Sequence, residues 1–195
     1  MLLVPARSLP EGANWAYELK LDGYRALAIK VDGRVHLRSR NNKDFNARYP
    51  AVAKALTPLP DETVIDGEVV ALDESGRPSF NILQNHGSSG APIVYYVFDV
   101  LILEGRDVMV EPLSARRELL RTEILPTLSE PVRHCPELNA GLADVIASVR
   151  AAGLEGLVAK RLDSRYEPGQ RSGAWLKTRI NRGQEFVLGG YTVGG

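Results

Sequence analysis

The sequence has very little cysteine and no long apolar run. Its single cysteine, Cys135, excludes an internal disulfide and a zinc site built from several cysteines. No apolar stretch reaches the roughly 18 residues that a membrane-spanning helix needs, and residues 1–7 are too short for a signal peptide. We therefore expect a cytoplasmic protein with a reduced thiol and no membrane partner.

The phosphate-binding loops of the common nucleotide folds are also missing. No G-x-x-x-x-G-K-[ST] sequence occurs, and no helix follows the glycine-rich residues 189–195. Internal repeats and low-complexity tracts are absent as well. If the protein uses a nucleotide, it binds it with neither a P-loop nor a dinucleotide fingerprint.

Charge is balanced in total but unevenly distributed. The 24 basic and 24 acidic side chains cancel. Residues 1–60 hold ten Lys/Arg against five Asp/Glu, residues 61–112 hold two against ten, and residues 161–182 hold six against two. This pattern fits a cationic groove for phosphates beside carboxylates for a metal, and it equally fits solvated charged faces.

The hydrophobic pattern predicts a mixed α+β fold in which strands mostly follow strands. Alternation predicts strands at 15–21, 24–31, 35–39, 63–72, 93–103, 132–135, 156–161, 174–180 and 185–192. Helical spacing predicts helices at 51–56, 80–86, 113–125 (capped by Ser114) and 141–152. We expect the first three strands to form a meander, and antiparallel sheets flanked by helices rather than a doubly wound parallel sheet.

One stretch, Glu18-Leu19-Lys20-Leu21-Asp22-Gly23-Tyr24-Arg25, places a lysine at the end of an expected strand. A lysine is a nucleophile only when its amine is unprotonated, which desolvation or nearby cations can favour. Arg25 is such a cation, and its planar fork also suits a phosphate or a ribose. Taken alone, K-x-D-G-x-R equally describes a strand end with solvated charges.

Four further stretches carry unusual side chains in expected strands: Asp66-Gly67-Glu68, Phe98-Asp99, Glu155–Lys160 and Trp175–Arg179. Carboxylates in an apolar strand are costly unless they bind a cation or an amine, and an aromatic ring can stack on a base. Two cations on one strand face, about 6–7 Å apart, suit a phosphate. The simpler alternatives are a β-bulge, core packing of the aromatic rings, and a surface pair of Glu155 with Lys160.

Together and in this order, K-x-D-G-x-R, D-G-E, F-D-x-L, E-G-x-x-x-K and W-x-K-x-[KR] resemble the motifs of the covalent nucleotidyltransferases, which are ATP-dependent DNA ligases, RNA ligases and mRNA-capping enzymes. The resemblance spans Trp15 to Arg179. Residues 39–41, 112–117, 166–172 and 185–191 are similar to the ligase domain of bacterial LigD, the end-joining DNA ligase.

This resemblance implies an α+β fold with two antiparallel β-sheets flanked by helices, the ATP-grasp-like adenylation fold of DNA ligases. Residues 1–14 would be a lead-in and residues 15–188 the adenylation (nucleotidyltransferase) domain. Residues 189–195 would be a linker towards a C-terminal OB-fold domain that this sequence does not include.

The resemblance also implies a role for each motif residue. Lys20 would attack the α-phosphate of ATP, expel pyrophosphate and form lysyl-AMP. The adenine contacts would be Glu18, Leu19 and Phe98, and the remaining nucleotide-binding residues would be Arg25, Arg40, Glu68, Lys160, Lys177 and Arg179. Glu68 and Glu155 would bind Mg2+ or Mn2+. Many relatives carry Lys where Arg179 stands, and Arg does not have the geometry of Lys.

The implied function is the adenylation of an ATP-dependent DNA ligase that joins nicked or broken DNA in bacterial end joining, at the nucleoid. Ku and fused polymerase or nuclease domains follow only from the LigD resemblance. We expect a monomer that adenylates itself slowly and seals nicks poorly or not at all. The alternatives are an RNA ligase, a capping-type nucleotidyltransferase and a non-catalytic nucleic-acid-binding module, although binding phosphate backbones requires no carboxylate pair.

Overall fold

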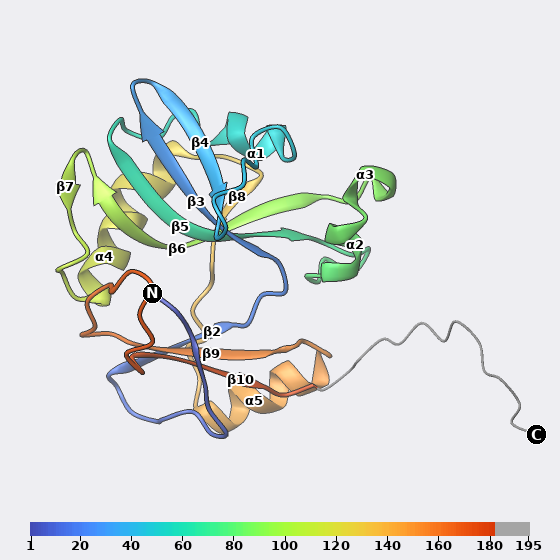
Figure 1. Ribbon diagram of the computed structural model, residues 1–195. Helices are drawn as coiled ribbons and strands as arrows, with labels where there is room; N and C mark the ends of the chain where they lie inside the picture. The colour runs from blue at the N-terminus through green and yellow to red at the C-terminus, as the bar shows by residue number, and fades with distance from the viewer. Residues whose placement is uncertain (182–195) are drawn as a thin grey trace, which may run out of the picture.

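The computed structural model describes residues 1–181 and divides them between two β-sheets (Figure 1). The smaller sheet has the strand order β1-β10-β9-β2, with β1 (Val4–Pro5), β2 (Trp15–Leu19), β9 (Gly156–Arg161) and β10 (Trp175–Arg179). The larger sheet has the order β4-β3-β5-β6-β7, and β8 pairs with β6. Its strands are β3 (Tyr24–Val31), β4 (Arg34–Ser39), β5 (Thr63–Ala71), β6 (Ile93–Leu103), β7 (Arg106–Asp107) and β8 (Val132–His134). The predicted mixed α+β class with two sheets is confirmed.

Short helices flank the sheets. They are α1 (Pro50–Ala55), α2 (Phe80–Gln84), α3 (His86–Ser89), α4 (Leu113–Leu119) and α5 (Leu142–Ala151), and α4 continues as a π-helical turn (Leu120–Ile124) and a 3-10 turn (Leu125–Thr127). The predicted helix at 113–125 therefore changes its winding from Leu120 onward, and the final 3-10 turn contains Pro126, which has no N–H to donate. No helix in the described part of the chain is long and apolar enough to cross a membrane.

The predicted cap of α4 is wrong. Pro112 occupies the N-cap position and no side chain caps the helix. The backbone N–H groups of Leu113 and Ser114 instead donate to the carbonyls of Ser164 and Leu162, at 2.9 Å each. The loop after β9 thus satisfies the free donors at the start of α4.

The predicted meander of the first three strands is also wrong. β3 and β4 form the expected hairpin, whereas β2 pairs with β9 in the other sheet and not with β3. Tyr17 of β2 packs with Val145 and Val149 of α5, in a core separate from that of the larger sheet. Residues 20–23 are therefore the crossing from one sheet to the other, not a hairpin turn (Figure 1).

Most strand pairs are antiparallel, as expected, but two are parallel. β1 pairs with β10, and β8 pairs with β6. The register of β5 against β6 shifts between Asp66 and Gly67, so the bulge considered for this stretch is present. The two-residue strands β1 and β7 were not predicted. The predicted strand at 185–192 and the predicted linker at 189–195 lie outside the described residues.

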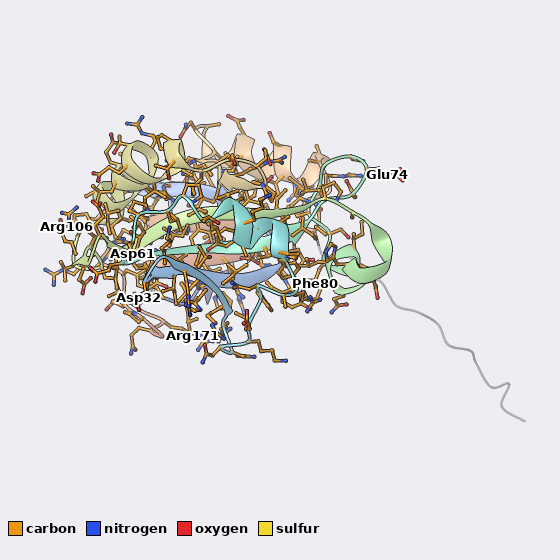
Figure 2. The ribbon with its side chains drawn as sticks, turned by 90° about the horizontal axis from the view of Figure 1, so that it is seen from above. Asp32, Asp61, Glu74, Phe80, Arg106 and Arg171 are labelled. Atoms are coloured by element: carbon orange, nitrogen blue, oxygen red, sulfur yellow. The ribbon has the colours of Figure 1, made fainter. Side chains whose placement is uncertain are left out.

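A view from above shows how the larger sheet extends (Figure 2). Asp32, Asp61 and Arg106 mark one end of the molecule, and Glu74 and Phe80 mark the other. Arg171, in the loop between β9 and β10, lies along the side between these two ends.

Candidate active site

A pocket of about 530 Å³ lies where the two sheets meet. The crossing segment contributes Lys20, Leu21 and Gly23, and the loop after β4 contributes Arg40, Asn41 and Lys43. Nine of the eleven predicted site residues line this pocket, namely Glu18, Leu19, Lys20, Arg25, Arg40, Glu68, Phe98, Lys160 and Lys177. The other two, Glu155 and Arg179, adjoin it through Lys20.

Lys20 is held by both its backbone and its side chain. It directly follows β2, and its N–H donates to the Gly156 carbonyl at 2.9 Å. Its ammonium donates to one carboxylate oxygen of Glu155, and the other oxygen accepts a hydrogen bond from Arg179 Nε at 3.0 Å. Glu155 is therefore the partner of Lys20, and the alternative of a surface pair between Glu155 and Lys160 is wrong.

The groups around Lys20 carry both signs of charge. Burial lowers the pKa of Lys177, and the charges of Lys20 and Arg179 lower it further. For the carboxylate of Asp22 the effect has the opposite sign: burial raises its pKa, and the negative charge of Glu155 raises it further. Asp22 was not among the predicted site residues, although its place in K-x-D-G-x-R was the available signal. A nucleophile candidate thus lies beside two carboxylates and two further cations.

Glu18 and Lys160 form a buried ion pair on the pocket wall. Glu18 is 3% exposed, and its carboxylate lies 2.6 Å from Lys160 Nζ and accepts a hydrogen bond from Arg117. The Lys160 ammonium lies 4.0 Å from the ring centroid of Phe98 and 4.3 Å from that of Trp175. A cation already lies over the Phe98 ring, so a base stacking on that side must displace Lys160.

Two residues of this wall were missed by the sequence reasoning. The available signal for Arg117 was its place in residues 112–117, which resemble LigD, and Cys135 had none. Cys135 is 2% exposed, and its Sγ lies 3.9 Å from Glu18. Burial raises the pKa of the Cys135 thiol, as does the Glu18 charge, so this thiol is protonated and unreactive at neutral pH.

Arg25 is engaged within the protein. Its Nε and Nη2 donate to the two carboxylate oxygens of Asp66, at 3.0 and 2.5 Å, and Nη1 donates to the Met1 carbonyl at 2.6 Å. Tyr166 Oη donates to the same carboxylate at 2.8 Å. The expectation that Asp66 binds a cation is therefore met by Arg25. In this structure Arg25 links β3 to Asp66 of β5 and to the Met1 carbonyl. Its predicted contact with a ribose or phosphate requires these hydrogen bonds to break.

Asp99, the acid inside an apolar strand, pairs with Arg116. Two hydrogen bonds of 2.8 and 2.9 Å join them, and both side chains are 0% exposed. Arg116 also donates to the carbonyls of Glu111 and Ser164 at 2.6 and 3.0 Å. Burial raises the pKa of Asp99, while the hydrogen bonds and charge of Arg116 oppose that rise. This pair lies behind the pocket and fixes β6 to α4.

Glu68 lies on the larger-sheet side of the pocket. It accepts a hydrogen bond from the Gly23 N–H at 3.1 Å. Burial raises its pKa to about 7, against the charges of Lys20 and Arg25. A Cβ at Gly23 would come within 2.3 Å of the Val69 carbonyl oxygen, so only glycine lets the crossing pass this close to β5.

The carboxylates suit a metal that arrives with a nucleotide. Among residues 1–181, no group of three or more His, Cys, Asp or Glu side chains could hold a metal ion. Mg2+ is commonly bound by one or two carboxylates together with substrate phosphates. Glu155 and Glu68 therefore fit a shared site with phosphate oxygens and do not fit a closed protein site.

The chain matches a protein-family model for the ATP dependent DNA ligase domain over residues 5–179. It therefore belongs to the ATP-dependent DNA ligase domain family. Within that family it is similar to the ligase domain of LigD, as the sequence resemblance predicted. The match covers both sheets and every motif from Lys20 to Arg179.

Two curated relatives illustrate this similarity. The chain is 41% identical over 186 residues to the multifunctional non-homologous end joining protein LigD of Pseudomonas aeruginosa, covering 94% of this chain and 22% of that protein. It is 32% identical over 195 residues to the SPbeta prophage-derived DNA ligase-like protein LigB of Bacillus subtilis, covering 98% of this chain and 71% of that protein. The chain thus spans less than a quarter of that LigD.

Solved structures agree with this placement. The ligase domain of Mycobacterium tuberculosis LigD superimposes with a TM-score of 0.77 at 36% identity, covering 91% of this chain and 58% of that one. A mycobacterial DNA ligase D complexed with ATP and MES gives a TM-score of 0.73 at 40% identity, covering 85% and 54%. An archaeal ATP-dependent RNA ligase, at 20% identity and a TM-score of 0.53, shares the fold alone.

Proposed function

We propose that this chain is the adenylation domain of an ATP-dependent DNA ligase, which forms lysyl-AMP on Lys20 for strand joining in bacterial end joining. The observation that carries the proposal is the position of Lys20. It lies at the crossing between the two sheets, in the wall of a pocket that is lined by carboxylates and by cations. The similarity to LigD supports DNA as the substrate.

The first step is attack on the α-phosphate of ATP. The Lys20 ammonium must lose a proton before Nζ can attack, and Glu155 is the hydrogen-bond acceptor of that ammonium. A bond then forms between Nζ and the α-phosphorus, and the bond to the pyrophosphate oxygen breaks, so pyrophosphate leaves with the electron pair. Lys177, which has no ion pair among the described residues, and Arg179 would hold the α-phosphate.

Glu155 and Glu68 would hold Mg2+ or Mn2+ together with the phosphates, where the ion supplies charge neutralisation during phosphoryl transfer. Adenine would reach Phe98 once Lys160 moves away from that ring, and Glu18 and Leu19 would border the base. Arg40 at the pocket rim and Arg25, once released from Asp66, would then contact phosphate or ribose.

The later steps use DNA. AMP would pass from Lys20 to the 5′-phosphate of nicked or broken DNA, and a 3′-hydroxyl would then displace AMP to close the strand. Partnership with Ku, fused polymerase or nuclease domains, a monomeric state and a place at the nucleoid belong to this proposal through the LigD resemblance alone.

The test is intact mass after incubation with ATP and Mg2+. The wild type, Lys20→Ala and a control, Lys54→Ala on α1, are compared, and each is first checked for AMP already attached. We expect an AMP-sized increment on the wild type and the control but not on Lys20→Ala, and no corresponding increment with GTP. If the wild type gains no AMP, carries none before incubation and still gains none in a chain extended by an OB-fold domain, the proposal fails and a binding module becomes the better description.

A further inference from the structure

A second groove opens at the edge of the smaller sheet, next to the nucleotide pocket. Its lining residues are Pro5, Ala6, Arg7, Lys177, Thr178 and Arg179. Lys177 also lines the nucleotide pocket, so this residue is common to both hollows. Arg7 belongs to none of the motifs that define the nucleotide site.

The groove exists because β1 is shorter than β10. The two strands pair only at Val4 with Leu176 and at Pro5 with Lys177. One more hydrogen bond, from the Ala6 N–H to the Lys177 carbonyl at 2.9 Å, ends the contact. The other edge of β10 remains paired with β9 as far as Arg179. Among residues 1–181, no strand therefore pairs with this edge of β10 beyond Lys177, and Arg7 follows directly after Ala6 beside it.

The charges in the groove are all positive. Three of its lining residues are cations and none is an acid. Within the part of the chain that the structure describes, the side chains of Arg7 and Lys177 have no ion pair, and Arg179 shares Glu155 with Lys20. Like charges close together repel each other, and a bound anion would offset this electrostatic repulsion. The groove thus has the charge of a phosphate site and a direct connection to the reacting centre.

We propose that this groove is a phosphate-binding extension of the nucleotide pocket, with Arg7 as an additional phosphate-binding residue. The proposal rests on the proposed function, since it assigns the groove to the phosphates of that reaction. These phosphates have two sources. One is the pyrophosphate end of ATP, which leaves when Lys20 attacks, and the other is the backbone of the DNA strand.

The test compares Arg7→Gln with Arg34→Gln in the full chain. Arg34 is an exposed arginine on β4, an edge strand of the larger sheet, and it lines none of the hollows described here. Calorimetry with inorganic pyrophosphate measures the first source. Fluorescence anisotropy with a nicked duplex over a salt series measures the second. Arg7→Lys, which keeps the charge, and circular dichroism exclude a loss caused by misfolding.

We expect Arg7→Gln to weaken binding of at least one probe by about five-fold, with Arg34→Gln unchanged and Arg7→Lys intermediate. Weaker pyrophosphate binding identifies the nucleotide as the source. Weaker DNA binding, with the slope of log affinity against log salt reduced in magnitude by about one, identifies the DNA backbone. A folded Arg7→Gln that binds both probes like the wild type overturns the proposal. If the chain carries no AMP and gains none, even when extended by an OB-fold domain, the proposed function fails, but these binding measurements remain interpretable.

Discussion

Replacing Arg116 by methionine should remove a large part of the stability of the domain. Methionine fills much of the volume of the arginine stem, but it leaves the Asp99 carboxylate buried at 0% exposure without its two hydrogen bonds. Breaking a buried ion pair on one side costs about 3–5 kcal/mol. A domain of this kind has a total stability of about 5–15 kcal/mol, so Arg116→Met should lie near the threshold of unfolding.

The second variant separates charge from packing. Asp99→Leu combined with Arg116→Met removes both charges, and replacing a buried pair by apolar groups is often close to neutral. We therefore expect the double variant to recover more than half of the lost free energy. The pH dependence has a defined sign. With Arg116 gone, the rise that burial causes in the pKa of Asp99 is opposed only by the weaker effect of the Lys160 charge. The deficit of Arg116→Met should therefore be smallest below pH about 4, near the pKa of an unfolded aspartate, and should grow as the pH rises.

The assay is urea unfolding followed by circular dichroism and tryptophan fluorescence. Arg121→Met serves as the control, because Arg121 pairs with Glu118 on an exposed surface at 2.5 Å. Such pairs contribute about 0–1 kcal/mol. If Arg116→Met loses no more than this control does, or if the double variant is as unstable as the single one, the assignment of the cost to an unpaired buried carboxylate is wrong.

Three further predictions follow from the described geometry. Gly156→Ala should destabilise the protein by more than about 2 kcal/mol, because a Cβ there would come within 2.1 Å of the Thr178 carbonyl oxygen; Gly87→Ala, which meets nothing within 4 Å, should be neutral in the same urea titration. Burial raises the pKa of Glu68 to about 7, so this group stabilises the fold at low pH and loses that contribution as the pH rises through 7. The wild type should therefore lose stability between pH 5 and pH 8 relative to Glu68→Gln, and equal slopes would contradict the assignment. Cys135, which is buried, should resist a thiol reagent in the native protein and react fully in concentrated guanidinium chloride; rapid native labelling would show that the pocket wall opens.

Strand positions were largely predictable from the sequence. The alternation and the apolar runs located β3, β6 and β9 with their observed bounds. Successive side chains of a strand point to opposite faces, so burial of one or both faces is visible in the local sequence. The site residues were predictable for a different reason. Their order along the chain resembles a known motif series, and nine of them line one pocket.

Strand partners and ion-pair partners were not predictable in the same way. Nothing in residues 15–31 indicates that β2 and β3 belong to different sheets. Alternation shows that one face of a strand is buried, but it does not show which strand lies beside it. Asp99 was recognisable as an anomaly, but its partner Arg116 lies 17 positions away on a helix. Glu155 was predicted to be a metal ligand, and only the three-dimensional structure reveals its contact with Lys20.

The pairing of β1 with β10 has a consequence for how the protein forms. It joins residues 4–5 to residues 176–177, so β1 cannot pair until β10 has been synthesised. Contacts between such distant residues are slow to form. β10 carries Lys177 and β2 leads directly to Lys20, so the reacting centre depends on segments from both ends of the described chain. A nascent chain that stops short of β10 can build the larger sheet yet lacks a complete nucleotide pocket.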